Sequence, residues 1–144
     1  MPRIDKYTPE AGGFRAPLNA AYSAPRVSSK PVGVVVGVSL NTTGRVVLGG
    51  PNNSALIGVV CLARDLPAGA VVDVIQHGEI VEFGTGTDGQ TAAAAGTNYF
   101  AVAATGAMVA GTGAGTETSL GNRKVGWTVE ATRLVVRVET ATPA

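Results

Sequence analysis

The 144-residue chain has few of the residues on which most protein chemistry depends. It contains one cysteine, Cys61, and one histidine, His77, and charged residues make up only 15% of it. A single cysteine excludes a disulfide framework within one chain, and zinc-type centres use two or more histidine or cysteine ligands. A histidine-based triad would have to use His77. The sequence therefore predicts no catalytic residues, no metal site and no cofactor-binding residues.

Long apolar segments are lacking as well. No stretch approaches the roughly 18 uninterrupted apolar residues of a membrane-spanning helix, and the polar N-terminus does not resemble a signal peptide. We therefore expect no membrane partner, and synthesis in a reducing cytoplasm. In that compartment Cys61, within the apolar run 55–63, is expected to be a small buried hydrophobe.

Two local patterns hint at chemistry, and turns explain both better. Residues 84–89 match G-x-G-x-x-G, but a dinucleotide site needs a helix directly after the glycines and an acidic residue about twenty positions on. Four alanines and Gly96 follow instead. His77 and Glu79 flank a glycine, and no nucleophile is tied to them by spacing. We expect a hairpin loop and an exposed turn histidine.

What the sequence does contain is an abrupt change of composition at Pro31. Residues 1–31 hold five of the eight prolines, and closely spaced prolines disfavour helix and strand alike. Five basic and two acidic residues give this segment a net charge of +3, whereas six basic and eight acidic residues give the remainder −2. Such dispersed charge suits a protein surface and not nucleic acid, which favours runs of lysine or arginine. We predict an extended arm over 1–31 and a β-domain over 32–144.

The arm also holds three of the seven aromatic residues, Tyr7, Phe14 and Tyr22. One explanation is a disordered tail with incidental aromatics. Aromatics are depleted in disordered chains, so we favour an arm that orders on binding, with the three rings filling pockets and Arg15 pairing with a carboxylate. Deletion of residues 2–22 is then expected to leave a folded domain that no longer binds its partner.

After Pro31 the chain reads as short Val/Ile/Leu stretches interrupted by Gly, Asn or Asp, without a convincing amphipathic helix. This pattern predicts an all-β fold, a small β-barrel or sandwich-like domain with little or no helix. Trp127 is expected in the core or at a protomer interface, and the Gly/Thr/Ala-rich segments 84–97 and 110–122 are expected to be loops. The predicted strands are 32–40, 45–48, 55–63, 70–76, 79–83, 98–104, 123–130 and 133–139.

The segment 58–83, GVVCLARDLPAGAVVDVIQHGEIVEF, combines a strand, a Pro/Ala-Gly turn and an expected hairpin across His77-Gly78. Together with 125–130 and 133–138, it resembles the head decoration proteins of tailed phages, also called capsid cement proteins. Residues 2–7 and 12–18 are similar to the arm of the versions found in phages of actinobacteria. The resemblance covers most of the chain, is weakest across 84–122, and rests on no catalytic motif.

The resemblance implies a non-enzymatic β-domain, often a homotrimer, on the outer surface of the virion capsid. Its N-terminal segment would contact the major capsid protein and join neighbouring subunits. Two alternatives stay open at this point. One is another virion component, such as a tail-tube or head–tail connector protein, and the other is a small β-barrel enzyme or ligand carrier whose 84–89 loop closes a pocket.

Overall fold

The computed structural model describes residues 12–50, 54–83, 94–102, 104–111 and 123–138, and these residues contain strands and no helix. The predicted all-β class is therefore confirmed, and no helix in the described ranges could cross a membrane. In chain order the strands are β1 (Gly13–Pro17), β2 (Arg26–Val27), β3 (Lys30–Pro31), β4 (Val34–Leu40), β5 (Val46–Leu48), β6 (Gly58–Leu62), β7 (Val71–Ile75), β8 (His77–Val81), β9 (Asn98–Ala101), β10 (Met108–Gly111), β11 (Arg123–Glu130) and β12 (Arg133–Arg137).

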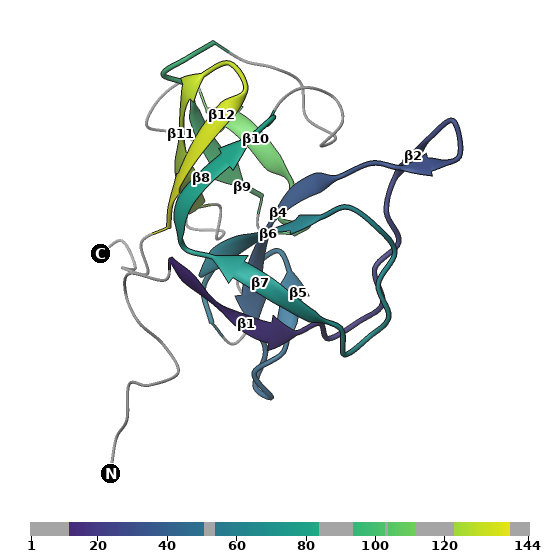
Figure 1. The fold of residues 1–144 in the computed structure, drawn as a ribbon. Coiled ribbons are helices and arrows are strands. Elements are labelled where there is room, and N and C mark those ends of the chain that lie inside the picture. The colour runs from purple at the N-terminus through teal and green to yellow at the C-terminus, as the bar shows by residue number, and fades with distance from the viewer. Residues whose placement is uncertain (1–11, 51–53, 84–93, 103, 112–122, 139–144) are drawn as a thin grey trace.

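Two antiparallel five-stranded sheets form the body of the protein (Figure 1). The first sheet has the order β1-β7-β6-β4-β5, and the second has the order β10-β9-β11-β12-β8. Among the described strands, β2 and β3 pair only with each other. A bridge between Val36 and Ala107 joins β4 to the residues before β10, so the two sheets are also linked through their backbones.

The first hydrophobic core lies between the two sheets. Val35 and Val59 reach it from the first sheet, and Tyr99 and Leu134 reach it from the second. Phe83 enters it from the segment just after β8. The rings of Phe83 and Tyr99 meet edge to face with centroids 4.8 Å apart, a favoured aromatic geometry. Burial of this kind contributes about 1.5–3 kcal/mol for each large apolar side chain.

A second core fills the opposite face of the first sheet. Leu18, Val38, Val46, Val60 and Val74 meet there, and each is at most 2% exposed. Strands β4 and β6 therefore have apolar neighbours on both faces. This explains why their sequences are nearly continuous apolar runs and do not alternate between apolar and polar residues.

The predicted hairpin at 41–44 is confirmed. Strands β4 and β5 pair antiparallel on either side of it, with Leu40 opposite Val46. The Asn41 side-chain oxygen accepts hydrogen bonds from the backbone N–H groups of Thr43 and Arg45, both at 3.0 Å. Gly44 has φ +77°, a conformation that favours glycine. The predicted hairpin of β11 and β12 is confirmed as well.

The predicted hairpin across His77-Gly78 is wrong. Strand β7 belongs to the first sheet, whereas β8 belongs to the second, where His77 lies opposite Arg137. The chain crosses between the sheets at Gln76, whose carbonyl accepts a hydrogen bond from Val138 N–H at 2.9 Å. The apolar pattern of a strand indicates which of its faces is buried, but it does not indicate which other strand it pairs with. The sequence therefore could not distinguish a hairpin from a crossover between sheets.

Two smaller expectations also change. Cys61 is exposed, although Val59, two positions earlier on the same face of β6, is fully buried. The second sheet therefore covers Val59 and does not extend over Cys61. Strand β10 (Met108–Gly111) begins before, and runs into, the segment predicted as the loop 110–122. The rest of that loop, and residues 84–93 of the other predicted loop, lie outside the described residues.

The prolines do not keep the described part of the N-terminal segment free of strands. Strand β1 pairs with β7 from Gly13 opposite Ile75 to Pro17 opposite Val71, and Leu18 directly after it is 2% exposed. The expectation that 1–31 lacks strands is therefore wrong at β1, β2 and β3. Pro17 is tolerated because β1 is an edge strand. In such a strand the N–H groups of alternate residues point away from the sheet and need no partner strand. Residues 1–11 lie outside the description.

Candidate binding surfaces

Two of the predicted aromatic anchors lie against the protein's own core. Phe14 on β1 and Tyr22 are half-buried and pack on the second core. Tyr22 also exchanges two backbone hydrogen bonds with Leu66, at 2.8 and 2.9 Å. Burial raises the pKa of the Tyr22 phenol, and the negative charge of Asp65 raises it further. Both rings are thus committed to this chain's packing, while Tyr7 lies outside the described residues.

Arg15 is exposed, as an anchor must be, but it already has a carboxylate within its own chain. Its Nε donates to Asp73 Oδ1 at 2.7 Å, across the β1–β7 pair. The two side chains are 75% and 69% exposed, so water screens the pair and its contribution to stability is at most about 1 kcal/mol. A partner could therefore compete for either charge at little cost.

Trp127 lies in neither hydrophobic core. It is half-buried on the outer face of the second sheet, opposite Val135 on β12, with the Lys124 ammonium 5.7 Å from its ring centroid. A shallow groove of about 420 Å³ runs beside it, lined by His77, Gly78, Trp127, Val135, Val136 and Arg137. Of the two predicted locations, the core is therefore wrong, and a protomer interface stays a prediction.

The outer face of the second sheet also carries a cluster of charges at the end near the β11–β12 turn. Arg133 pairs with Glu79 on β8, and its Nη1 lies 3.2 Å from Glu130 Oε1. The two carboxylates raise the pKa of the Arg133 guanidinium, with Glu79 making the larger contribution. Glu79 thus faces arginine and not His77. His77 is exposed as expected, although it begins a strand and does not sit in a turn.

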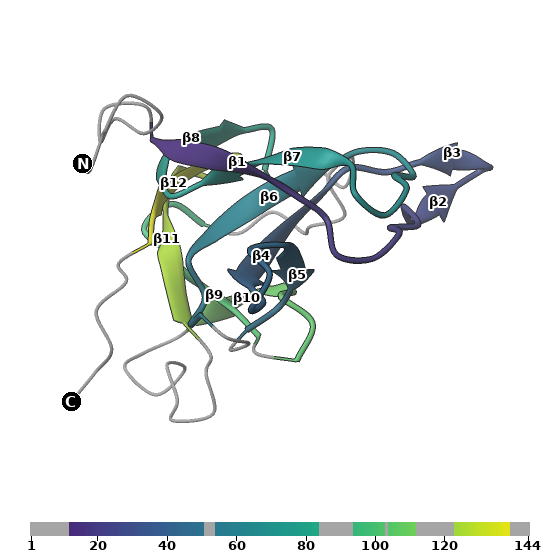
Figure 2. The same cartoon turned by 90° about the horizontal axis from the view of Figure 1, so that it is seen from below.

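The sequence did not predict a projecting element formed by two loops, which we call the basic lobe and define as residues 19–33 and 63–69. The hairpin of β2 and β3 forms its tip and points away from the body in two perpendicular views (Figures 1 and 2). Its turn residues, Ser28 and Ser29, have φ of 51° and 66°. Hairpin turns with two positive φ values usually contain Asn-Gly, so Ser-Ser gave little sequence signal.

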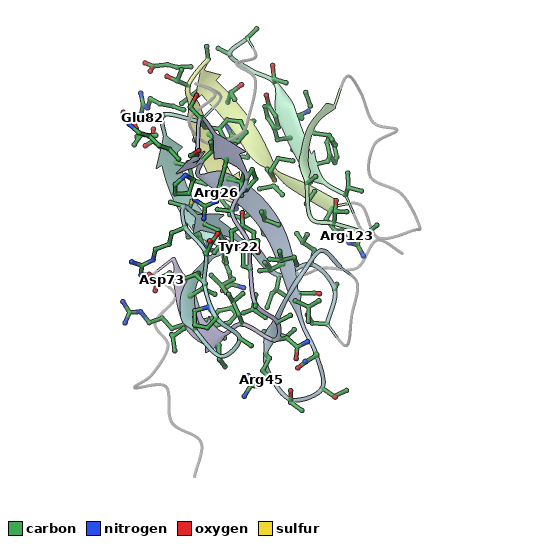
Figure 3. All side chains as sticks on the ribbon, turned by 90° about the vertical axis from the view of Figure 1, so that its right-hand side faces the viewer. Tyr22, Arg26, Arg45, Asp73, Glu82 and Arg123 are labelled. Carbon is green, nitrogen blue, oxygen red and sulfur yellow. The ribbon has the colours of Figure 1, made fainter. Side chains whose placement is uncertain are left out.

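Asp65 fastens the two loops of the lobe together. Its carboxylate accepts hydrogen bonds from Ala24 N–H at 2.8 Å and from Arg26 Nη2 at 2.5 Å. The hydrogen bond from Ala24, assisted by the charge of Arg26, holds the pKa of Asp65 below its ordinary value. Figure 3 looks toward the lobe and labels Arg26 and Tyr22, which both belong to the first of its two loops.

Comparison with known proteins shows the fold and not a family. No family model matches the chain, and no similar sequence is found among curated proteins. A solved structure described as "Mycobacterium phage Patience" contains a chain that superimposes with a TM-score of 0.65. The two chains are 19% identical, and the match covers 98% of this chain and 97% of the other. The whole architecture is therefore similar to that of a protein in a phage structure.

Proposed function

We propose that this chain is a structural protein of a tailed-phage virion, and specifically a capsid decoration protein. It would bind the outer surface of the capsid, stabilise the lattice of the major capsid protein, and act as a homotrimer without enzymatic activity. The observation that carries the proposal is the end-to-end fold similarity to a chain from a phage structure, together with the resemblance of 58–83 and 125–138 to decoration proteins. A homotrimer would present three copies of each weak capsid contact at once, and the combined affinity of several linked contacts greatly exceeds that of one.

The packing of Phe14 and Tyr22 within the domain bears on the choice of capsid anchors. We therefore propose Tyr7, together with the exposed Arg15, as the anchors to test first. Deletion of 2–22 would also remove β1 and Leu18 from the second core. A test of capsid binding should therefore stop the deletion at residue 11.

The test is co-sedimentation of the purified protein with capsids that lack it. We expect saturable binding by the wild type, and loss of most binding on deletion of residues 2–11 or in Tyr7→Ala. Thr8→Ala, one position away, is the matched control and should bind normally. Circular dichroism of each variant would show that the domain is still folded.

Two results would contradict the proposal. The first is absence of any wild-type binding to capsids. The second is assembly into stacked rings, or into single rings larger than a trimer, under the electron microscope, which would favour a tail-tube or connector protein. A reproducible thermal shift with a nucleotide or metal ion would instead revive the alternative of a small ligand-binding β-barrel.

A further inference from the structure

The tip of the basic lobe is an ordered element that contributes little to the protein's own core. Every side chain described between Pro25 and Pro31 is exposed. Both central residues of the turn, Ser28 and Ser29, nevertheless hold a left-handed backbone conformation that costs non-glycine residues free energy. Strain in an exposed segment without a packing role points to a contact outside the chain.

The lobe is fixed in position, so a partner would meet a preformed surface. Tyr22 and Leu66 bond reciprocally through their backbones, Asp65 holds both Ala24 and Arg26, and Val32 N–H donates to the Pro25 carbonyl at 2.7 Å across the base of the hairpin. Preorganisation lowers the entropy that association must overcome.

The charge of the lobe is positive. Arg26, Lys30 and Arg64 stand against Asp65, which leaves a net charge of +2. All four side chains are exposed. Within the described ranges, Lys30 and Arg64 form no ion pair, so their charges are available to a partner.

The complementary surface lies on the same chain, at the end of the second sheet. Glu79 and Glu82 from the β8 segment and Glu130 from β11 stand there against Arg133, a net charge of −2. Glu82 comes next to the β11–β12 turn because Phe83 N–H donates to the Thr132 carbonyl at 2.9 Å. We call this surface the acidic end.

Apolar exposure and strain coincide with the charge at the acidic end. Val81 and Val129 are 64% and 42% exposed, a feature expected of a surface that is covered in an assembly. Glu82 has φ 60°. It and the two serines of the lobe are the non-glycine residues with positive φ in the described part of the chain, so strain marks both surfaces.

We propose that the basic lobe of one copy binds the acidic end of a second copy. Such a contact is head to tail, because two different surfaces meet, and its repetition closes into a ring when the rotation between copies allows. Lys30 and Arg64 would approach Glu82 and Glu130, while the hairpin covers Val81. This inference deepens the self-association in the proposed function, and it can be tested without capsids.

The experiment is sedimentation velocity of the full-length protein over a range of concentrations at low and high salt. Wild type should self-associate and dissociate as salt is raised. Lys30→Glu and Glu82→Lys should each weaken association on the order of tenfold or more. The double variant Lys30→Glu/Glu82→Lys should recover much of the loss, because the exchanged charges again attract. Thr42→Glu, at the exposed turn of the β4–β5 hairpin and outside both surfaces, is the matched control and should associate normally.

Three results would overturn the inference. They are a wild type that remains monomeric at every concentration, single variants that associate like wild type, or a double variant as weak as the two losses combined. If Lys30→Glu kept its oligomeric state but lost capsid co-sedimentation, the lobe would be a capsid contact instead. Because the capsid assay and the association assay are separate, failure of one proposal does not imply failure of the other.

Discussion

Strand β1 and the β2–β3 hairpin come from the same proline-punctuated segment, yet their roles in the molecule are opposite. Residues 13–18 complete the first sheet and place Ala16 and Leu18 in the second core. The hairpin stands away from both sheets (Figure 2). Its described side chains are all exposed. The difference arises from the side-chain pattern and not from proline content. Phe14, Ala16 and Leu18 alternate toward one face, whereas the hairpin offers basic and hydroxyl side chains.

We therefore expect β1 to contribute to the stability of the protein and the β2–β3 hairpin to contribute to binding. Replacement of a residue in β1 should destabilise the protein through lost packing, whereas replacement at the tip of the lobe should leave the fold intact and alter association. The free energy of unfolding of variants in the two regions distinguishes these roles.

The largest effect is expected for Leu18→Ala. Leu18 is 2% exposed in the second core, so the substitution should lower the free energy of unfolding by about 2–4 kcal/mol. Lys30→Ala, in the hairpin, should change it by less than about 0.5 kcal/mol. Urea denaturation followed by tryptophan fluorescence measures both. Equal losses in the two variants would show that the hairpin is as integral to the fold as β1.

A smaller change of opposite sign is expected at the hairpin turn. Replacing Ser28-Ser29 by Asn-Gly should raise the free energy of unfolding by about 0.5–1 kcal/mol, because these residues adopt positive φ at lower cost. Ser23→Gly, at an exposed position of the lobe whose φ is not positive, should give no gain. If the double replacement destabilised the protein, the turn would not be strained.

The smallest effect is a pH dependence at Asp65. Folding lowers the pKa of this carboxyl, so its contribution to stability is fully present above the ordinary value of about 4 and is lost as the pH falls through the lower folded-state pKa. The free energies of unfolding of wild type and Asp65→Asn, measured by urea denaturation, should therefore differ at pH 6 and converge as the pH is lowered below about 4. A difference between the two proteins that stays constant with pH would argue against an ionised Asp65 as the fastener of the lobe.

Among the candidate site residues, the sequence predicted chemical character better than location. Arg15 is exposed and paired with a carboxylate, but the carboxylate is Asp73 of the same chain. The sequence pattern indicated that Phe14 and Tyr22 need apolar surroundings, and the second core of this chain supplies them. The lobe was missed because its Ser-Ser turn and its attachment at Asp65, 41 residues from Ala24, carry no local signal.

Local patterns were enough for the all-β class, for the β4–β5 and β11–β12 hairpins and for the change of composition at Pro31. Alternating or continuous apolar runs and turn residues act over a few positions, so one sequence contains them. The crossover at Gln76, the exposure of Cys61, the docking of β1 and the two charged surfaces were decided by the tertiary structure. Each depends on which distant strand or loop covers a given face, and that is the outcome of packing the whole chain at once.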